Sequence, residues 1–173
     1  MVYGDVELRS PWFSSRWKLV DPNDRVLADI RRSGRTYVSV ADIADGTRLL
    51  LEPAGYGTVQ ALDVTRGREG AEEVGRIVRR SWMGRHWDIV GHRYNFGLVS
   101  DHMHRWHLDV ANAQVATLRG SPVSYNHVKV HCWLGVPTSA VLLAWHVVAR
   151  PWEAAAEPRG MVAVTPPGAA TDR

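Results

Sequence analysis

Two short stretches of the chain are rich in histidine, the side chain that most often binds transition metals in proteins. His102 and His104 lie two residues apart, and His127 and His131 lie four apart. Alternate residues of a β-strand point to the same side, so each pair can share one face. Zinc needs three or four such ligands at one point, with an open position if the site is catalytic. These four histidines define one hypothesis, a metal-binding protein or a hydrolase.

The alternation of the surrounding residues favours a plainer interpretation. If Trp106 and Leu108 face a core, His102 and His104 face it too, whereas His107 faces outward. No single strand then presents three histidines on one side. The metal-binding spacings H-E-x-x-H and paired C-x-x-C are also absent from the sequence. The alternative is that these histidines are solvated or hydrogen-bonded at the entrance of a strand.

Arginines supply the second candidate site. Four of them are interleaved with aromatic residues, and the set consists of Arg76, Arg79, Arg80 and Arg85 with Trp82, Trp87 and Tyr94. Cationic and aromatic side chains together can hold anionic lipid headgroups or stack nucleic-acid bases. The alternative is a solvated sheet surface, because nearly all basic residues of this chain are Arg, with Lys only at Lys18 and Lys129.

Net charge and missing motifs narrow the choice of function. The formal charge is +3 and is spread along the chain, which favours mild attraction to anionic surfaces and disfavours a dedicated nucleic-acid interface. The nucleophile motif G-x-S-x-G is absent, and the S-x-x-K match from Ser15 to Lys18 has none of its partner motifs. Gly67 and Gly70 lack the spacing of a phosphate loop. The sequence therefore favours a non-catalytic protein and predicts no cofactor.

The elements that must position these side chains are short strands. From Arg16 onward, apolar and polar residues alternate in short runs, separated by turn residues such as Asp21-Pro22-Asn23-Asp24 and Asp45-Gly46. Proline presets a turn dihedral, while Asp, Asn and Gly accept turn geometry. About twelve such runs, with turn signals between them, are typical of an all-β sandwich or barrel.

One segment near the end is apolar on every side. Within residues 138–150, Ser139 and His146 are the interruptions, so a helix here must be buried. Pro137 suits the first helical turn, and Thr138 or Ser139 offers a capping hydroxyl. At about 20 Å, such a helix is shorter than the hydrocarbon core of a bilayer, which is about 30 Å thick. A buried strand is the alternative.

The strands and the helix complement each other. An antiparallel sheet with one apolar face needs cover, and a helix apolar on all sides needs to be surrounded. We therefore predict a mainly β fold, a closed antiparallel barrel of about twelve strands around one buried hydrophobic C-terminal helix. His146 is then either a neutral histidine that donates to a backbone carbonyl or lies near the barrel mouth, or a buried polar group that marks a ligand cavity beside the helix.

The chain length of 173 residues suits one domain, which we place at residues 1–152. Residues 153–173 are rich in Ala, Pro and Gly and are predicted to be a disordered tail. Cys132 is the single cysteine, so no intrachain disulfide can form. The first residues lack the layout of a signal peptide, so we expect a cytoplasmic location, with peripheral attachment if a membrane is the partner.

This order of features resembles the tubby C-terminal-like superfamily, and within it the LURP-one-related proteins and the phospholipid scramblases. The units that carry the resemblance are the hairpins at residues 20–26 and 40–46, the strand at 74–78 followed by 85–90, and the hydrophobic segment 136–152. The resemblance covers residues 5–152 and implies a closed barrel threaded by a hydrophobic C-terminal helix. A cysteine cluster and an acidic calcium loop like those of scramblases are absent, so lipid scrambling is not implied.

We therefore predict a non-catalytic binding or scaffold module that associates with anionic phospholipid surfaces through Arg76, Arg79, Arg80 and Arg85. One alternative is a metal-binding protein or hydrolase that uses the four histidines. The other is nucleic-acid binding through the arginine and aromatic face. The sequence specifies no oligomeric state.

Overall fold

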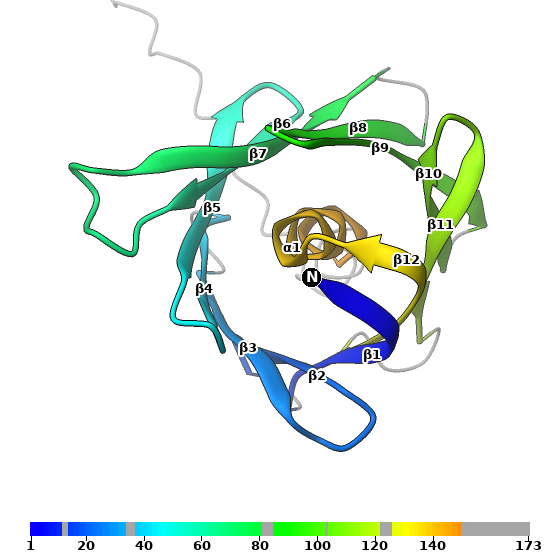
Figure 1. The fold of residues 1–173 in the computed structure, drawn as a ribbon, viewed down its shortest axis with the longest axis horizontal. Helices are drawn as coiled ribbons and strands as arrows, with labels where there is room; N and C mark the ends of the chain where they lie inside the picture. The colour runs from blue at the N-terminus through cyan, green and yellow to red at the C-terminus, as the bar shows by residue number, and fades with distance from the viewer. Residues whose placement is uncertain (12–13, 34–36, 81–84, 103, 122–125, 150–173) are drawn as a thin grey trace, which may run out of the picture.

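The computed structural model describes residues 1–11, 14–33, 37–80, 85–102, 104–121 and 126–149. They form a closed barrel of antiparallel strands around one helix (Figure 1). The elements are β1 (Val2–Arg9), β2 (Arg16–Val20), β3 (Val26–Arg32), β4 (Ser39–Ile43), β5 (Arg48–Gly55), β6 (Thr58–Asp63), β7 (Glu72–Arg79), β8 (His86–Gly91), β9 (Tyr94–His102), β10 (Arg105–Val110), β11 (Ala113–Gly120), β12 (His127–Val136) and α1 (Thr138–Val148). Each strand pairs with its neighbours in the sequence, and β12 closes the barrel by pairing with β1. The predicted fold is confirmed, and the predicted tail lies outside the described residues.

Alternation along the strands decides which side chains fill the barrel. In β10, Trp106 and Leu108 are buried, and His107 between them lies on the outer face. In β12, Val130 is buried and the adjacent Lys129 is exposed. The inward side chains of the strands pack with α1 in one hydrophobic core. Polar chemistry is therefore carried mainly by the outer face of the barrel.

Helix α1 is buried from residue 140 to residue 148. The helix prediction is confirmed and the strand alternative is excluded, although the helix ends at Val148, two residues before the predicted end. The predicted capping hydroxyl is wrong. Pro137 occupies the N-cap position, no side chain caps the helix, and the hydroxyl of Ser139 bonds to Tyr94 instead. In the described part of the chain, no helix has the length and hydrophobicity needed to cross a membrane.

Tyr94 of β9 ties the start of α1 to the barrel wall. Its hydroxyl donates to the Val74 carbonyl at 3.2 Å and shares a 3.0 Å hydrogen bond with Ser139. The ring lies against two glycines, since a Cβ added at Gly91 or Gly75 would stand 2.3 or 2.4 Å from Tyr94 atoms. These glycines leave room for an aromatic ring between wall and helix. Burial raises the pKa of the Tyr94 hydroxyl, which keeps it a hydrogen-bond donor.

The other end of α1 meets polar side chains inside the barrel. The buried guanidinium of Arg32 lies 5.6 Å from the ring of Trp145, a cation–π distance. His146 is fully buried, and its Nδ1 lies 3.3 Å from the hydroxyl of Ser39. His146 is therefore a hydrogen-bonded histidine of the core, and the contact found is with the Ser39 hydroxyl and not with the backbone carbonyl that we predicted.

Candidate functional site

The structure separates two of the four predicted metal ligands that we expected on one strand. β9 ends at His102, and His104 lies in the turn that leads to β10, so the expectation of a shared strand is wrong. The chain reverses there, because His102 already pairs with Arg105 of β10. The alternation that we extended backwards from Trp106 does not continue through a turn.

His127 and His131 do share the outer face of β12, and each meets a carboxylate of β1. His127 Nε2 lies 3.1 Å from Glu7, and His131 Nδ1 lies 2.7 Å from Asp5. Two strands, β10 and β11, separate β12 from β9. No group of three or more His, Cys, Asp or Glu side chains that suits a metal ion occurs within the described ranges. Among the described side chains, His104, His127 and His131 therefore belong to no group that a metal site requires, and the side chain of His102 lies outside the described residues.

The four predicted arginines make different contacts. Arg76 forms two 2.6 Å hydrogen bonds with Glu73, which raise its pKa, and Arg80 lies 3.1 Å from Asp88. Arg79 stacks on Trp87, with its guanidinium 5.7 Å from the ring centre.

Arg85 is exposed just before β8, and Trp82 lies outside the described residues. Tyr94 faces inward and holds α1. The arginine and aromatic set is therefore divided between ion pairs, a stack at the barrel rim and the core.

A different set of basic side chains does converge on the outer face. Register places Arg105 of β10 opposite Arg119 of β11, and Arg119 opposite Lys129 of β12. All three are exposed, while their neighbours Leu118 and Val130 point into the core. We refer to Arg105, Arg119 and Lys129 as the basic row. Residues directly opposite each other in a sheet have Cβ atoms about 5 Å apart, so three cations lie side by side.

The next outward row carries groups that donate and accept protons. His107, Thr117 and His131 lie opposite one another across β10, β11 and β12. His107 is held by two carboxylates, with Nδ1 2.9 Å from Asp101 and Nε2 3.2 Å from Asp109. The imidazoles are therefore oriented by acidic partners, and a hydroxyl lies between them.

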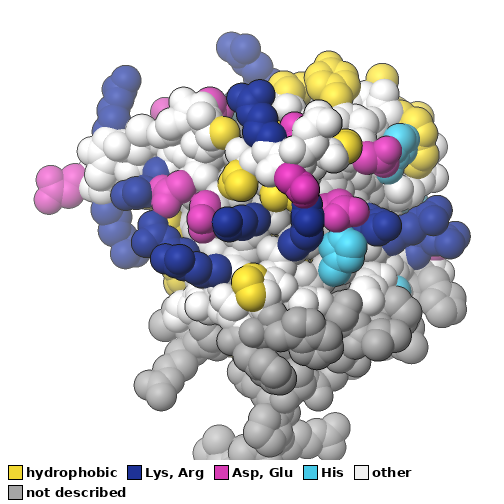
Figure 2. Space-filling model, turned by 90° about the horizontal axis from the view of Figure 1, so that it is seen from below, with side chains coloured by type: hydrophobic (Ala, Val, Ile, Leu, Met, Phe, Trp, Pro, Cys, Tyr) yellow, Lys and Arg dark blue, Asp and Glu magenta, His cyan; other side chains and the backbone are white. Residues whose placement is uncertain are grey.

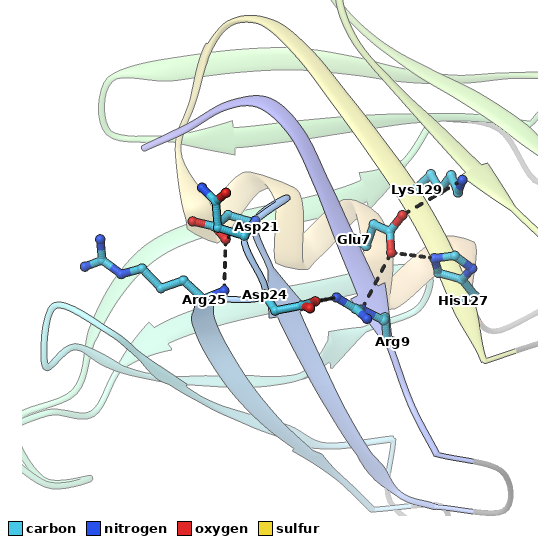
Figure 3. Close-up of polar contacts among 8 residues, drawn as sticks. Glu7, Arg9, Asp21, Asp24, Arg25, His127 and Lys129 are labelled. Carbon is cyan, nitrogen blue, oxygen red and sulfur yellow. Dashed lines mark hydrogen bonds and ion pairs between the residues drawn. The ribbon is translucent and has the colours of Figure 1, made fainter.

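The basic row, together with Thr117 and His131 of the next row, lines a groove of about 810 Å³ over β1, β12, β11 and β10. Its acidic side chains already have partners. Figure 3 shows the Glu7 carboxylate between Arg9, His127 and Lys129, at 3.6, 3.1 and 3.9 Å. Within the described residues, by contrast, neither Arg105 nor Arg119 has an acidic partner. The groove thus keeps two guanidinium groups available.

An arrangement of like charges costs stability unless something compensates it. Like charges directly opposite each other in a sheet are unfavourable by about 0.2–1 kcal/mol. A guanidinium presents a planar fork of N–H donors that fits carboxylate or phosphate oxygens. A ligand that carries more than one negative charge would relieve the repulsion between Arg105 and Arg119. The chemistry that this groove supports is anion binding.

Nucleophilic chemistry has little support in the described structure. Cys132 is buried on the inner face of β12, and burial raises the pKa of its thiol to about 11. At neutral pH it is protonated and faces the core, so it is a packing residue. Thr117 supplies a hydroxyl to the groove, but within the described residues it forms no hydrogen bond to His107 or His131.

Sequence reasoning missed the basic row because it depends on register. Pairing β10 with β11 around the turn at Ala111 and Asn112 would place Arg105 opposite Leu118. A bulge between Leu108 and Asp109 shifts the pairing by one residue and brings Arg119 opposite Arg105. The available signal was the clean alternation of β10, which shows that Arg105 points outward but not what faces it.

Comparisons with known proteins agree on the fold alone. No protein-family model and no curated protein matches the chain. An X-ray structure of a protein from Arabidopsis thaliana is similar, with a TM-score of 0.52 and 13% sequence identity. The match covers 84% of this chain and 88% of the Arabidopsis chain. At this identity the likeness shows a shared fold and carries no function.

Proposed function

We propose that this chain is a non-catalytic binding module that attaches to anionic phospholipid surfaces through the basic row. The observation that carries the proposal is the register of Arg105, Arg119 and Lys129, which gathers three cations in a groove and leaves two of them without acidic partners among the described residues. Phospholipid phosphates and serine carboxylates supply the oxygen anions that such forks bind.

The proposal keeps the chemistry expected from the sequence and moves it to other residues. Arg76 and Arg80 are engaged with Glu73 and Asp88, so they have less to offer an external anion than Arg105 and Arg119. It also includes membership of the tubby C-terminal-like superfamily, in the LURP-one-related and scramblase branch, which the strand order and central helix support. Anionic lipids give the cytoplasmic leaflet its negative potential, so the proposed location is cytoplasmic and peripheral at the membrane.

Vesicle flotation with a matched pair of variants tests the proposal. Arg105→Gln with Arg119→Gln removes two charges from the groove, and Arg25→Gln with Arg93→Gln removes two exposed charges elsewhere. Each basic residue near an anionic surface contributes about 1 kcal/mol, so the groove pair should bind about thirtyfold more weakly. The control pair should bind phosphatidylserine vesicles nearly as the parent does.

The parent should float with vesicles that contain phosphatidylserine and not with pure phosphatidylcholine, and salt should reduce the binding. Equal losses in both variant pairs would show that net charge, and not the groove, is responsible. Equal binding to vesicles with and without phosphatidylserine would refute the proposal. Retention on single-stranded DNA without binding to vesicles would replace it with the nucleic-acid alternative.

A further inference from the structure

A bulge in β12 turns two large apolar residues out of the barrel. Val2 pairs with Val136, and Gly4 pairs with Cys132, so residues 133–135 of β12 face only residue 3 of β1. Extra residues in one strand break the inward and outward alternation locally. As a result Trp133 and Leu134, although adjacent in the chain, are both exposed, at 52% and 61%.

Tyr3 of β1 and the preceding Met1 add two more large exposed side chains beside this bulge. Tyr3 and Met1 are 67% and 72% exposed. Both lie over Gly135, where an added Cβ would stand 2.4 Å from the Tyr3 hydroxyl and 2.9 Å from the Met1 methyl group. We call Met1, Tyr3, Trp133 and Leu134 the apolar patch. Gly135 leaves room for the side chains of Met1 and Tyr3, and it follows Trp133 and Leu134 directly in the chain.

The apolar patch borders the groove that contains the basic row. Trp133 lines that groove, and its ring lies 4.9 Å from the ring of His131 in an edge-on arrangement. Figure 2 shows hydrophobic side chains gathered at the upper right of this face of the barrel, next to charged ones. The other large exposed apolar side chains belong to other strands and connections, among them Tyr56, Val90 and Val110. Cations and apolar groups thus form one surface.

We propose that the apolar patch inserts into the interfacial layer of the same bilayer whose anionic headgroups occupy the groove. This inference rests on the proposed function and gives it an orientation, with β1 and β12 against the membrane. Tyr and Trp side chains favour the boundary between headgroups and hydrocarbon, because one part of each is apolar and the other is polar. The basic row beside them supplies the attraction to anionic lipid.

The charge of this surface argues against a second copy of the chain as the occupant. A symmetric dimer brings the same surface of both copies together. Two such surfaces would bring two basic rows close to each other and increase the repulsion that already exists between Arg105 and Arg119. An anionic bilayer instead complements both parts of the surface.

Two exposed substitutions test the patch without touching the core. Trp133→Ser with Leu134→Ser should float about tenfold less with phosphatidylserine vesicles, because apolar area no longer leaves water. The basic row is intact in this variant. An unchanged thermal midpoint and a monomeric mass in solution should accompany the loss.

A reporter at the patch separates this inference from the proposed function. Leu134→Cys, labelled with an environment-sensitive fluorophore, should brighten on phosphatidylserine vesicles and be quenched by brominated acyl chains. Val90→Cys on β8, labelled in the same way, should not respond. The native Cys132 is buried with a raised pKa and should resist labelling.

The outcomes are distinct. If the parent binds vesicles and the groove pair loses binding, but the serine variant binds normally and the label at position 134 is silent, the patch inference fails and the proposed function stands. If the parent does not bind, both fail. A dimeric parent that becomes monomeric in the serine variant would show that the patch is an interface between copies, and would overturn the inference.

Discussion

Two rows of charged side chains on the outer face of the same barrel have opposite arrangements. On β2 to β5, register aligns Lys18, Asp29, Asp42 and Arg48, so that two acidic residues lie between two basic ones. Asp42 accepts from Arg48 at 2.5 Å and from Arg31 at 2.9 Å. On β10 to β12, three basic residues lie in succession. We call the first the balanced row.

The contrast shows that strand register decides whether charged residues neutralise one another or form a candidate anion-binding site. Both rows lie on antiparallel strands outside buried apolar residues, but the balanced row contains Asp29 and Asp42, and the basic row contains no acidic residue. In the balanced row the charges neutralise one another, and the Arg48 and Arg31 hydrogen bonds lower the pKa of Asp42 despite some desolvation. In the basic row the like charges repel one another, and Arg105 and Arg119 have no acidic partner within the described residues. Only the basic row has guanidinium groups with which an anionic ligand could pair.

The largest loss of stability should come from removing α1, against which the inward faces of the strands pack. Truncation before Val136 deletes α1 and leaves the inward faces of the strands without a core partner. We expect no cooperative unfolding transition for this variant by circular dichroism. A soluble truncated chain that melts cooperatively would show that the barrel does not depend on the helix.

A smaller loss of stability should follow from closing the space around Tyr94. Gly91→Ala places a methyl group against the Tyr94 ring and should cost about 1–3 kcal/mol, because the ring must move and its bond to Ser139 is lost. Gly97→Ala is the matched control, because its nearest neighbour is Asp109 at 4.0 Å. Urea unfolding of both variants measures the difference. Equal losses would mean that the glycines matter through backbone freedom alone.

The two rows should respond with opposite signs to the same type of substitution. Arg48→Gln removes a partner of Asp42 and should lower stability, whereas Arg119→Gln removes repulsion and should raise it. Each change should be about 0.5 kcal/mol, or about 1–2 °C in thermal midpoint at low salt. High salt should reduce both shifts. If both substitutions shifted the thermal midpoint in the same direction, the charges of the two rows would not differ in their effect on stability.

The smallest change in stability should come from protonation of Asp42 in the balanced row as the pH falls. The folded pKa of Asp42 is lowered, so its contribution is present above the unfolded pKa of about 4 and is lost as pH falls through the folded value. The parent should lose slightly more stability than Asp42→Asn over that window, by well under 1 kcal/mol because the pair is exposed. Urea unfolding of both proteins from neutral to acidic pH measures it. Parallel curves would contradict the lowered pKa.

Much of the fold follows from local chemistry that a sequence displays directly. The oxygen of Asp21 accepts from the backbone N–H groups of Asn23 and Arg25 at 2.9 Å, and Asp45 accepts from Thr47 at 2.9 Å. These turns were predicted from residue types alone. The apolar helix was predicted in the same way, because its composition leaves it no place except a core.

The candidate site was not predictable to the same extent. Alternation showed that Arg105 points outward, but the partner of Arg105 depends on one bulge, and a slip of one residue would have placed Leu118 there. The apolar patch depends on a second bulge, which breaks the alternation that the sequence pattern relies on. Bulges leave weak sequence signals, since they need no special residue at most positions.

Closure of the barrel between β1 and β12 has a consequence for synthesis. The first strand of the chain is completed by the last, while every other pair joins strands adjacent in sequence. At about 5–20 residues per second, β1 waits on the order of ten seconds for its second partner to be made. During that time its open edge and the apolar residues meant for the core are exposed. We therefore expect the unfinished sheet to be prone to aggregation until β12 and α1 have been synthesised.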